Sequence, residues 1–132
     1  MKTAYFLYAE DDPDDVELLR EALSREHKTV RMVSVADGYE LLAYLQAVKK
    51  FEPYPSLIIL DLQLPRLNGI ETLQLLRTDD LYRLIPAVIL SSHASASEMA
   101  SCRSLGADML GKPDEHQKWG PVIDKICGYI DA

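Results

Sequence analysis

This chain of 132 residues has few cysteines, no long apolar run and no signal-like N-terminus. Its two cysteines, Cys102 and Cys127, lack the spacing of a metal site or of a disulfide framework. No apolar stretch approaches the ~20 residues that are needed to cross a bilayer. The apolar segment at residues 4–9 is too short for a secretory signal. We therefore expect a protein of the reducing cytoplasm that does not contact the membrane.

A basic surface is missing as well. The chain has 14 lysines and arginines against 21 acids, which gives a formal net charge of −7. An acidic chain without a basic stripe is a poor partner for the phosphate backbone of nucleic acids, so we expect no direct nucleic-acid binding. The composition, 48% hydrophobic and 27% charged, is typical of a folded protein. Because the sequence shows neither a repeat nor a linker, we interpret residues 1–132 as one domain.

Short apolar runs alternate along the chain with segments of helical spacing, which predicts five strands and five helices. Pro13 suits the first turn of a helix, Asp37 can cap the second helix, and Gly106 can end the fourth. Gly120 and Pro121 must kink the last helix or delay its start. The strands are expected at residues 3–9, 30–35, 57–60, 86–90 and 109–110, and the helices near residues 13–23, 37–48, 70–77, 95–105 and 119–130.

Strands that are separated by helices imply a parallel sheet with helices on both faces. Since the crossovers between parallel strands are right-handed, few topologies remain. The simplest is an α/β fold with a doubly wound, flavodoxin-like sheet of five parallel strands in the order 2-1-3-4-5. Ligands of such a sheet bind beyond the carboxyl ends of its strands, so the residues that end the strands are the candidates for a site.

Carboxylates, a hydroxyl and an ammonium group follow the predicted strands. Glu10 and Asp11 follow the first strand, Asp61 the third, Ser91 the fourth and Lys112 the fifth. Clustered carboxylates suit a hard cation such as Mg²⁺. An aspartate beside that cation can attack phosphorus and form an aspartyl-phosphate. The lysine can neutralise the transferred charge, and the serine can donate a hydrogen bond to a phosphoryl oxygen.

Each of these residues also has an ordinary interpretation. A lone aspartate after a strand is most often a helix cap or a turn former, and a lone serine or lysine in a loop is most often solvated. Glu10 and Asp11 can simply complement a helix N-terminus. We assign Asp12, Asp14 and Asp15 to that role and keep them outside the site. The joint presence of all the members in one chain is what favours phosphoryl chemistry.

Five segments together carry a family resemblance over nearly the whole chain. The segments are the acidic pair in YAEDDPDD, then LIILDLQLPRLNG, IPAVILSS, LGAD and GKP. In them the sequence resembles the receiver domain of bacterial two-component response regulators. The stretch before the third strand and the segment RTDDLYRLIP are similar to stand-alone receivers, of the chemotaxis type and of the kind found beside bacterial phytochromes.

The resemblance implies a role for three residues that end strands. Asp61 would accept a phosphoryl group from a histidine kinase or a histidine phosphotransfer protein. Ser91 takes the place of the switch serine or threonine of the family, and Lys112 that of its phosphoryl-binding lysine. The peptide bond between Lys112 and Pro113 would be cis, because the trans preference is weak before proline.

The resemblance also implies a Mg²⁺ site. Asp11, Asp61 and the backbone carbonyl of Gln63 would bind the ion directly, and Glu10 would hold a water molecule bound to it. The cofactor that we expect is therefore Mg²⁺.

Further residues stand where the family modulates its site. Gln63 and His93 occupy positions that flank the phosphoryl group and influence its hydrolysis, and Ser92 adjoins them. His93 can instead be a solvent-facing loop residue. Two departures concern the fifth strand: Met109 replaces the usual aromatic residue, and one residue fewer separates the glycine that ends the fourth helix from the lysine.

We expect a phosphoryl group to bias an equilibrium between two states, since its charge would be offset by Mg²⁺ and Lys112. We expect no effector domain in this chain, so that output would be contact with an unknown downstream protein or phosphoryl relay. A homodimer is compatible with this function. Enzyme activity would be limited to self-catalysed phosphoryl acceptance and slow autodephosphorylation.

Three other functions fit parts of the sequence. A phosphohydrolase with an aspartyl nucleophile would resemble Asp-x-Asp, but the second position holds Gln63. A flavin-binding module of similar topology would have a Ser/Thr/Gly-rich phosphate loop where this chain has EDDPDD. A receiver-like scaffold that is never phosphorylated is disfavoured by the complete residue set, although the altered fifth strand keeps this alternative open.

Overall fold

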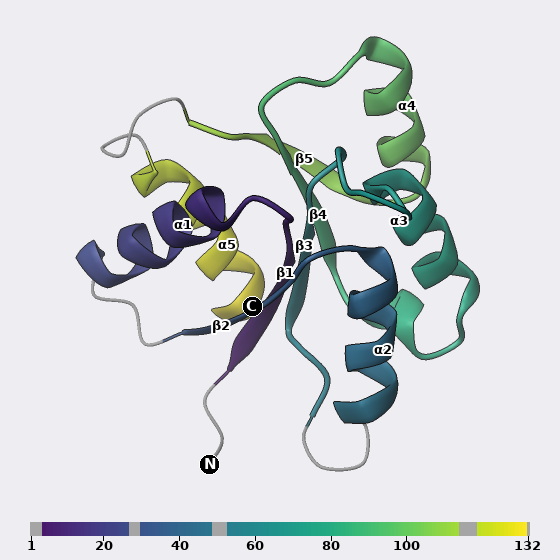
Figure 1. Ribbon diagram of the computed structural model, residues 1–132, viewed down its shortest axis with the longest axis horizontal. Coiled ribbons are helices and arrows are strands. Elements are labelled where there is room, and N and C mark those ends of the chain that lie inside the picture. Colours follow the sequence, from purple (N-terminus) through teal and green to yellow (C-terminus); the bar gives the residue numbers. More distant parts are fainter. Residues whose placement is uncertain (1–3, 27–29, 49–52, 114–118, 132) are drawn as a thin grey trace.

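A parallel sheet forms the centre of the computed structural model, which describes residues 4–26, 30–48, 53–113 and 119–131 (Figure 1). Its strand order is β2-β1-β3-β4-β5, which confirms the predicted doubly wound, flavodoxin-like topology. Thr3, where the first strand was expected to begin, lies outside the described residues. The strands are β1 (Tyr5–Ala9), β2 (Arg31–Val35), β3 (Leu57–Leu60), β4 (Ala87–Ser91) and β5 (Asp108–Gly111).

The helices cover both faces of the sheet. Helices α1 and α5 pack on one face, and α2, α3 and α4 pack on the other (Figure 1). No helix within the described ranges is both long and apolar enough to cross a membrane. The α-helices are α1 (Pro13–Arg25), α2 (Gly38–Val48), α3 (Gly69–Thr78), α4 (Ala96–Ser104) and α5 (Gly120–Asp131), and a 3-10 turn that the sequence did not predict is η1 (Tyr82–Leu84).

The ends of the helices follow the predicted capping chemistry. Asp37 caps α2 by accepting a hydrogen bond from the backbone N–H of Glu40 (2.9 Å). Gly106 follows α4 with a φ of 75°, the left-handed conformation that ends many helices. Helix α5 begins at Gly120, so Gly120 and Pro121 delay its start and do not kink it.

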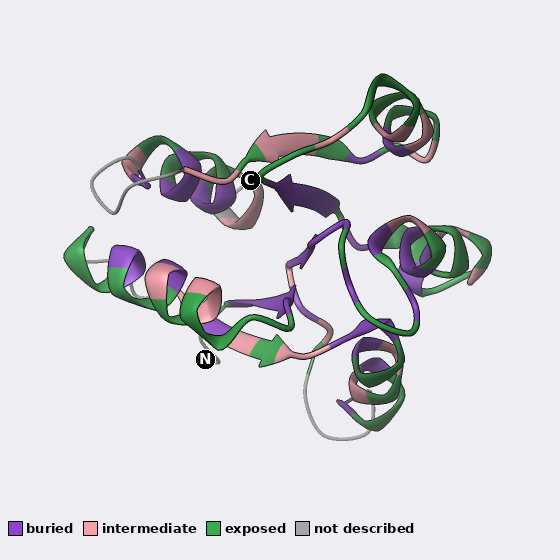
Figure 2. Ribbon diagram, turned by 45° about the horizontal axis from the view of Figure 1, so that its top comes forward, coloured by how far each residue is buried: buried purple, intermediate pink, exposed green. Residues whose placement is uncertain are grey.

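The central strands β1, β3 and β4 are buried because alternate side chains face two different cores. Phe6 and Tyr8 of β1 pack with α1 and α5, whereas Leu7 and Ala9 pack with α2, α3 and α4. All four are fully buried, whereas the helices expose residues on their outer sides (Figure 2). Each large apolar side chain that is buried in this way contributes about 1.5–3 kcal/mol. The sheet is therefore a firm support for the residues that follow its strands.

The loop between β3 and α3 approaches the start of α3 closely. The backbone N–H of Gly69 donates to the carbonyl of Leu62 (3.1 Å). A Cβ atom on Gly69 would lie 2.3 Å from the carbonyl oxygen of Asp61 and 2.9 Å from Cα of Leu62. Because these are backbone atoms, they cannot turn aside as a side chain can, and glycine is required here.

We predict that Gly69→Ala lowers the free energy of unfolding by about 1–3 kcal/mol, the usual cost of overpacking. Gly128→Ala is the matched control, since Gly128 is exposed in α5 and an added Cβ would meet no atom within 4 Å. That change should be neutral or should raise the free energy of unfolding by up to about 1 kcal/mol. Urea unfolding followed by circular dichroism measures both variants, and equal stabilities would contradict the close contact at Gly69.

Candidate functional site

Hydrogen bonds of the sheet continue one residue beyond three of its strands. The backbone N–H of Glu10 donates to the end of β2 (2.9 Å), that of Asp61 to the end of β1 (3.1 Å), and that of Lys112 to the end of β4 (2.9 Å). These bonds fix the backbone of each residue relative to its neighbours. The predicted residues therefore meet at one edge of the sheet.

Glu10, Asp11 and Asp61 form a cluster of carboxylates at this edge. One oxygen atom of each residue lies within 4.8 Å of those of the other two. Glu10 and Asp61 are only 4% and 6% exposed, whereas Asp11 is exposed to solvent. Like charges so close together repel each other, and a small divalent cation that takes oxygen ligands relieves that repulsion. The donor set thus fits Mg²⁺.

The ammonium group of Lys112 lies among three carboxylates. Its Nζ is 2.9 Å from Oδ2 of Asp15 and 3.0 Å from Oδ2 of Asp61, and it also donates to Glu10. An ammonium group has three N–H donors, and each of them has a carboxylate here. Burial alone would lower the pKa of Lys112, but the bonds to Glu10, Asp15 and Asp61 outweigh burial and raise it above its ordinary value. Lys112 therefore stays charged.

The prediction that Asp15 only complements the start of α1 is wrong. Asp15 stands in the first turn of α1 and reaches across to Lys112. It is not part of the three-carboxylate cluster. A carboxylate in the first turn of the helix after β1 lies near the end of that strand, and this is the signal that could have identified it.

Glu10 is held in a buried setting that resists its ionisation. Burial raises its pKa to about 7; the hydrogen bond from Lys112 opposes this rise, and the charge of Asp61 adds to it. The hydroxyl of Tyr8, which is fully buried, donates to Oε1 of Glu10 (3.1 Å). Burial first, and then the charge of Glu10, raises the pKa of Tyr8 far above its usual range. Sequence reasoning missed Tyr8 because a strand residue in an apolar run is predicted to be core.

Ser91 is engaged with its own loop. Its Oγ donates to the carbonyl of His93 (3.0 Å) and accepts from the backbone N–H of the same residue (3.1 Å). Ser91 is buried, whereas Ser92 and His93 are exposed. Gln63 is also exposed, and its backbone N–H donates to Oδ1 of Asp61 (3.1 Å). The structure thus brings Gln63 beside Asp61, and the modulating roles of these residues stay predictions.

The prediction that the peptide bond between Lys112 and Pro113 is cis is wrong, because no peptide bond between described residues is cis. The trans form remains the lower-energy form of an X–Pro bond unless its surroundings select the other.

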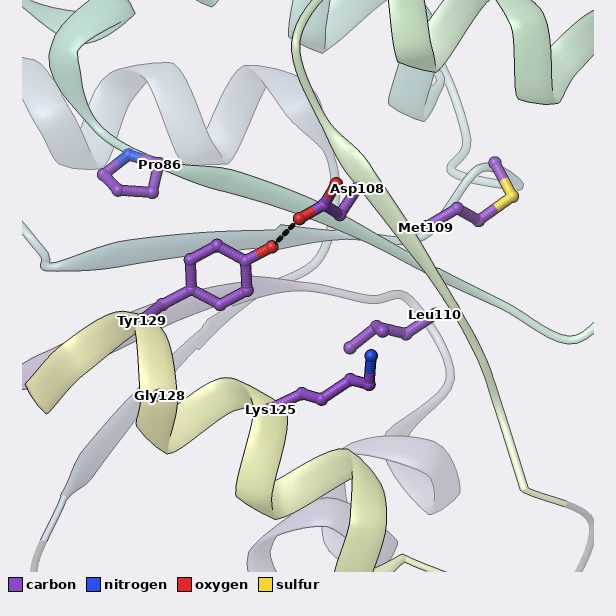
Figure 3. Close-up of a pocket in the computed structure, with 7 residues that line it drawn as sticks. All are labelled: Pro86, Asp108, Met109, Leu110, Lys125, Gly128 and Tyr129. Atoms are coloured by element: carbon purple, nitrogen blue, oxygen red, sulfur yellow. Dashed lines mark hydrogen bonds between the residues drawn. The ribbon is translucent and has the colours of Figure 1, made fainter. Parts of the chain in front are cut away.

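Met109 faces the side of β5 that carries α4. Figure 3 shows its side chain turned away from α5, toward which Leu110 points. Met109 packs against the core under α2, α3 and α4, and Leu110 against the core under α1 and α5.

A hollow lies between β5 and α5, where the hydroxyl of Tyr129 donates to Asp108 (Figure 3). It is lined by Pro86 and Asp108, at the amino ends of β4 and β5. It therefore lies away from the carboxylate cluster.

Comparison with known proteins identifies the family of this chain. Residues 6–119 match the model of the response regulator receiver domain. The chain belongs to the response regulator receiver family. Response regulator Rcp1 of Synechocystis sp. is 34% identical over 98 residues, which are 72% of this receiver and 67% of Rcp1. Protein PilG of Pseudomonas aeruginosa is 30% identical over 83 residues, 62% of this receiver and 58% of PilG. The receiver thus spans only part of the length of these relatives.

Solved structures of receivers have the same fold. The phosphorylated cyanobacterial phytochrome response regulator RcpA matches with a TM-score of 0.87 and 26% identity, over 99% of this receiver and 96% of RcpA. The Mn²⁺-bound form of Rcp1 matches with a TM-score of 0.81 and 25% identity, over 93% of this receiver and 91% of that chain. The predicted likeness to phytochrome-associated receivers is confirmed.

We predict that Asp11→Asn weakens Mg²⁺ binding by at least about tenfold, since loss of even a supporting residue of a metal site costs that much. Asp15→Asn should weaken binding by much less, because Asp15 contacts Lys112 and lies outside the cluster. Calorimetric titration of each variant with MgCl₂ measures the affinities. Equal losses would show that the metal site is misplaced.

A second prediction concerns pH in the metal-free receiver. Because the pKa of Glu10 rises from its ordinary 4.5 to about 7 on folding, the folded protein binds more protons than the unfolded chain between these values. Its free energy of unfolding should therefore fall as pH rises through this window. Glu10→Gln has no proton to lose, so we expect a flatter profile in urea titrations with EDTA. An unchanged slope in the variant would contradict this origin of the pH dependence.

Proposed function

We propose that this receiver accepts a phosphoryl group on Asp61 in a Mg²⁺-dependent reaction. The donor would be a histidine kinase or a histidine phosphotransfer protein. The observation that carries this proposal is the setting of Asp61, a buried carboxylate after β3 that belongs to the metal-binding cluster and lies 3.0 Å from Nζ of Lys112. Membership of the response regulator family supports it.

In the proposed reaction, Asp61 is the nucleophile. One of its carboxylate oxygens forms a bond to phosphorus while the bond from phosphorus to the donor histidine nitrogen breaks, and the imidazole keeps the electron pair. Bound Mg²⁺ would neutralise charge on the phosphoryl oxygens, with Asp11, Asp61 and the carbonyl of Gln63 as ligands and Glu10 holding a metal-bound water. The Mn²⁺-bound form of Rcp1 supports a divalent cation in a protein of this family.

Lys112 would change partners during this reaction. It shares Glu10 and Asp61 with the proposed metal site, so a bound cation would compete with its ammonium group for these oxygens. Asp15 lies outside the cluster and would keep Lys112 nearby. When Asp61 carries a phosphoryl group, the new negative charge would draw the ammonium group onto a phosphoryl oxygen.

Ser91 would act as the switch between two states. Its hydroxyl now bonds to the backbone of His93, and it would exchange these bonds for one to a phosphoryl oxygen. Because hydrogen bonds are exchanged and not lost, the two states of Ser91 would differ little in free energy, and a bound ligand can shift the equilibrium between them. Met109 would take the place of the aromatic residue of the family, because a flexible thioether can fill the space on the α4 side of β5.

Output would depend on a downstream partner. The phosphorylated form would bind another protein or pass its phosphoryl group on. We propose no turnover of a separate substrate, because Gln63 stands where a phosphohydrolase of the Asp-x-Asp type carries its second acid. The likeness to RcpA, a phytochrome response regulator, supports a photoreceptor kinase as one class of donor.

We predict that the protein gains one phosphoryl group when it is incubated with acetyl phosphate and Mg²⁺, and that Asp61→Asn gains none. EDTA should suppress the gain. Asp124→Asn is the matched control, because Asp124 is exposed in α5 and should leave the gain unchanged. Intact-protein mass spectrometry measures all four samples. No gain in the natural sequence, or an equal gain in Asp61→Asn, would overturn the proposal.

A further inference from the structure

A strained arginine stands in the loop that joins β3 to α3. Arg66 has a φ of 64°, and it is the only residue other than glycine with a positive φ in the described part of the chain. This left-handed conformation costs about 1–2 kcal/mol for a residue with a side chain. Such strain persists where the surroundings hold the residue in place. The contacts of Arg66 therefore call for an explanation.

The guanidinium group of Arg66 is held by the corner between β2 and α2. Its Nε (3.0 Å) and Nη2 both donate to Oδ2 of Asp37, a residue that is only 4% exposed. Its Cζ lies 5.3 Å from the centre of the Tyr39 ring, a distance at which a cation attracts an aromatic face. The other oxygen of Asp37 caps α2 through the N–H of Glu40 (2.9 Å). Asp37 thus joins the loop to the start of α2.

The loop and this corner also pack closely beside the ion pair. A Cβ atom on Gly38 would lie 2.9 Å from Cδ2 of Leu67 and 2.1 Å from Oγ1 of Thr72. Leu67, the residue after Arg66, is buried. The start of α2 therefore packs closely against the β3–α3 loop, the segment that Arg66 also binds.

The same loop begins with the proposed site. The backbone N–H of Gln63 donates to Oδ1 of Asp61, and the N–H of Gly69 donates to the carbonyl of Leu62. These bonds hold the inner part of the loop, and the ion pair of Arg66 holds its outer part. Tethers at both parts limit how far the Gln63 carbonyl, a proposed metal ligand, can turn. Ligands that are fixed in advance bind a cation more tightly than ligands that must first be ordered.

We propose that Arg66 is a positioning residue: through Asp37 it holds the β3–α3 loop so that Gln63 and Asp61 are ready to bind Mg²⁺. The inference rests on the proposed function, because it assigns the Gln63 carbonyl to the metal. The side chain of Arg66 is 62% exposed, and exposed ion pairs contribute little to global stability. The effect of Arg66 therefore falls on metal binding more than on unfolding.

Three substitutions separate this role from a general structural one. Arg66→Asn removes the guanidinium group but tolerates a positive φ. Asp37→Asn keeps an oxygen that can cap α2 but loses the charge that attracts Arg66. Arg66→Lys keeps the charge but cannot make the paired bonds of a guanidinium group. Arg83→Asn is the matched control, since its exposed pair with Asp80 (3.9 Å) lies beyond the other end of α3.

We expect Arg66→Asn and Asp37→Asn each to weaken Mg²⁺ binding by about three- to tenfold, which corresponds to the net contribution of one ordinary hydrogen-bonded contact. The double variant should be no weaker than either single variant, because both remove the same contact. Arg66→Lys should fall between them and the natural sequence. In reactions with acetyl phosphate, the Mg²⁺ concentration for half-maximal phosphorylation should rise, while the rate at saturating Mg²⁺ should change little. Arg83→Asn should match the natural sequence.

The possible failures are distinguishable. If the natural sequence binds Mg²⁺ and gains a phosphoryl group, but Arg66→Asn and Asp37→Asn bind Mg²⁺ equally well, the role of Arg66 is refuted and the proposed function stands. Additive losses in the double variant would also refute it, because the two residues would then act separately. If the natural sequence neither binds Mg²⁺ nor is phosphorylated, the proposed function fails and the role of Arg66 fails with it.

Discussion

The ion pairs of Lys112 allow carboxylates to share one buried edge of the sheet. Glu10, Asp15 and Asp61 all contact its Nζ, and Glu10 and Asp61 are almost fully buried. Carboxylates that lose water and face one another would otherwise take up protons. The raised pKa of Glu10 shows that even this lysine offsets the burial only in part. A divalent cation or a phosphoryl group that entered this edge would therefore compete with Lys112 for the carboxylate oxygens.

The fold supplies what that exchange requires. Backbone hydrogen bonds to neighbouring strands hold Glu10, Asp61 and Lys112 in place, so side chains can exchange partners while the backbone stays fixed. Asp15 reaches the lysine from α1, outside the three-carboxylate cluster. The β3–α3 loop approaches from the other side and is tied to the start of α2 by Arg66. The hydrogen-bonded strands and the tethered loop would confine the proposed change to a few hydrogen bonds, as a switch between two states requires.

Much of this arrangement could be predicted from the sequence because a parallel sheet needs only the order of its elements. The run LIIL followed by Asp61 predicted both a strand and the residue at its carboxyl end. The same reasoning predicted that Glu10 and Lys112 follow their strands at the same edge of the sheet. Contacts that depend on side-chain direction escaped prediction. Asp15 was assigned to a helix start, Tyr8 to the core, and the pairing of Arg66 with Asp37 spans 29 positions of sequence with a backbone conformation that no local pattern indicates. The family resemblance also suggested a cis bond before Pro113 that the structure does not have.

A crystal structure with Mg²⁺ and beryllofluoride, a mimic of the phosphoryl group, tests the central claim most directly. We predict beryllofluoride on Asp61, Mg²⁺ beside Asp11 and Asp61, and Nζ of Lys112 moved from the Asp61 carboxylate onto the mimic, with Ser91 Oγ turned from His93 toward it. A structure in which Lys112 keeps its bonds to Glu10 and Asp61 while Mg²⁺ and beryllofluoride bind elsewhere, or do not bind, would contradict the account.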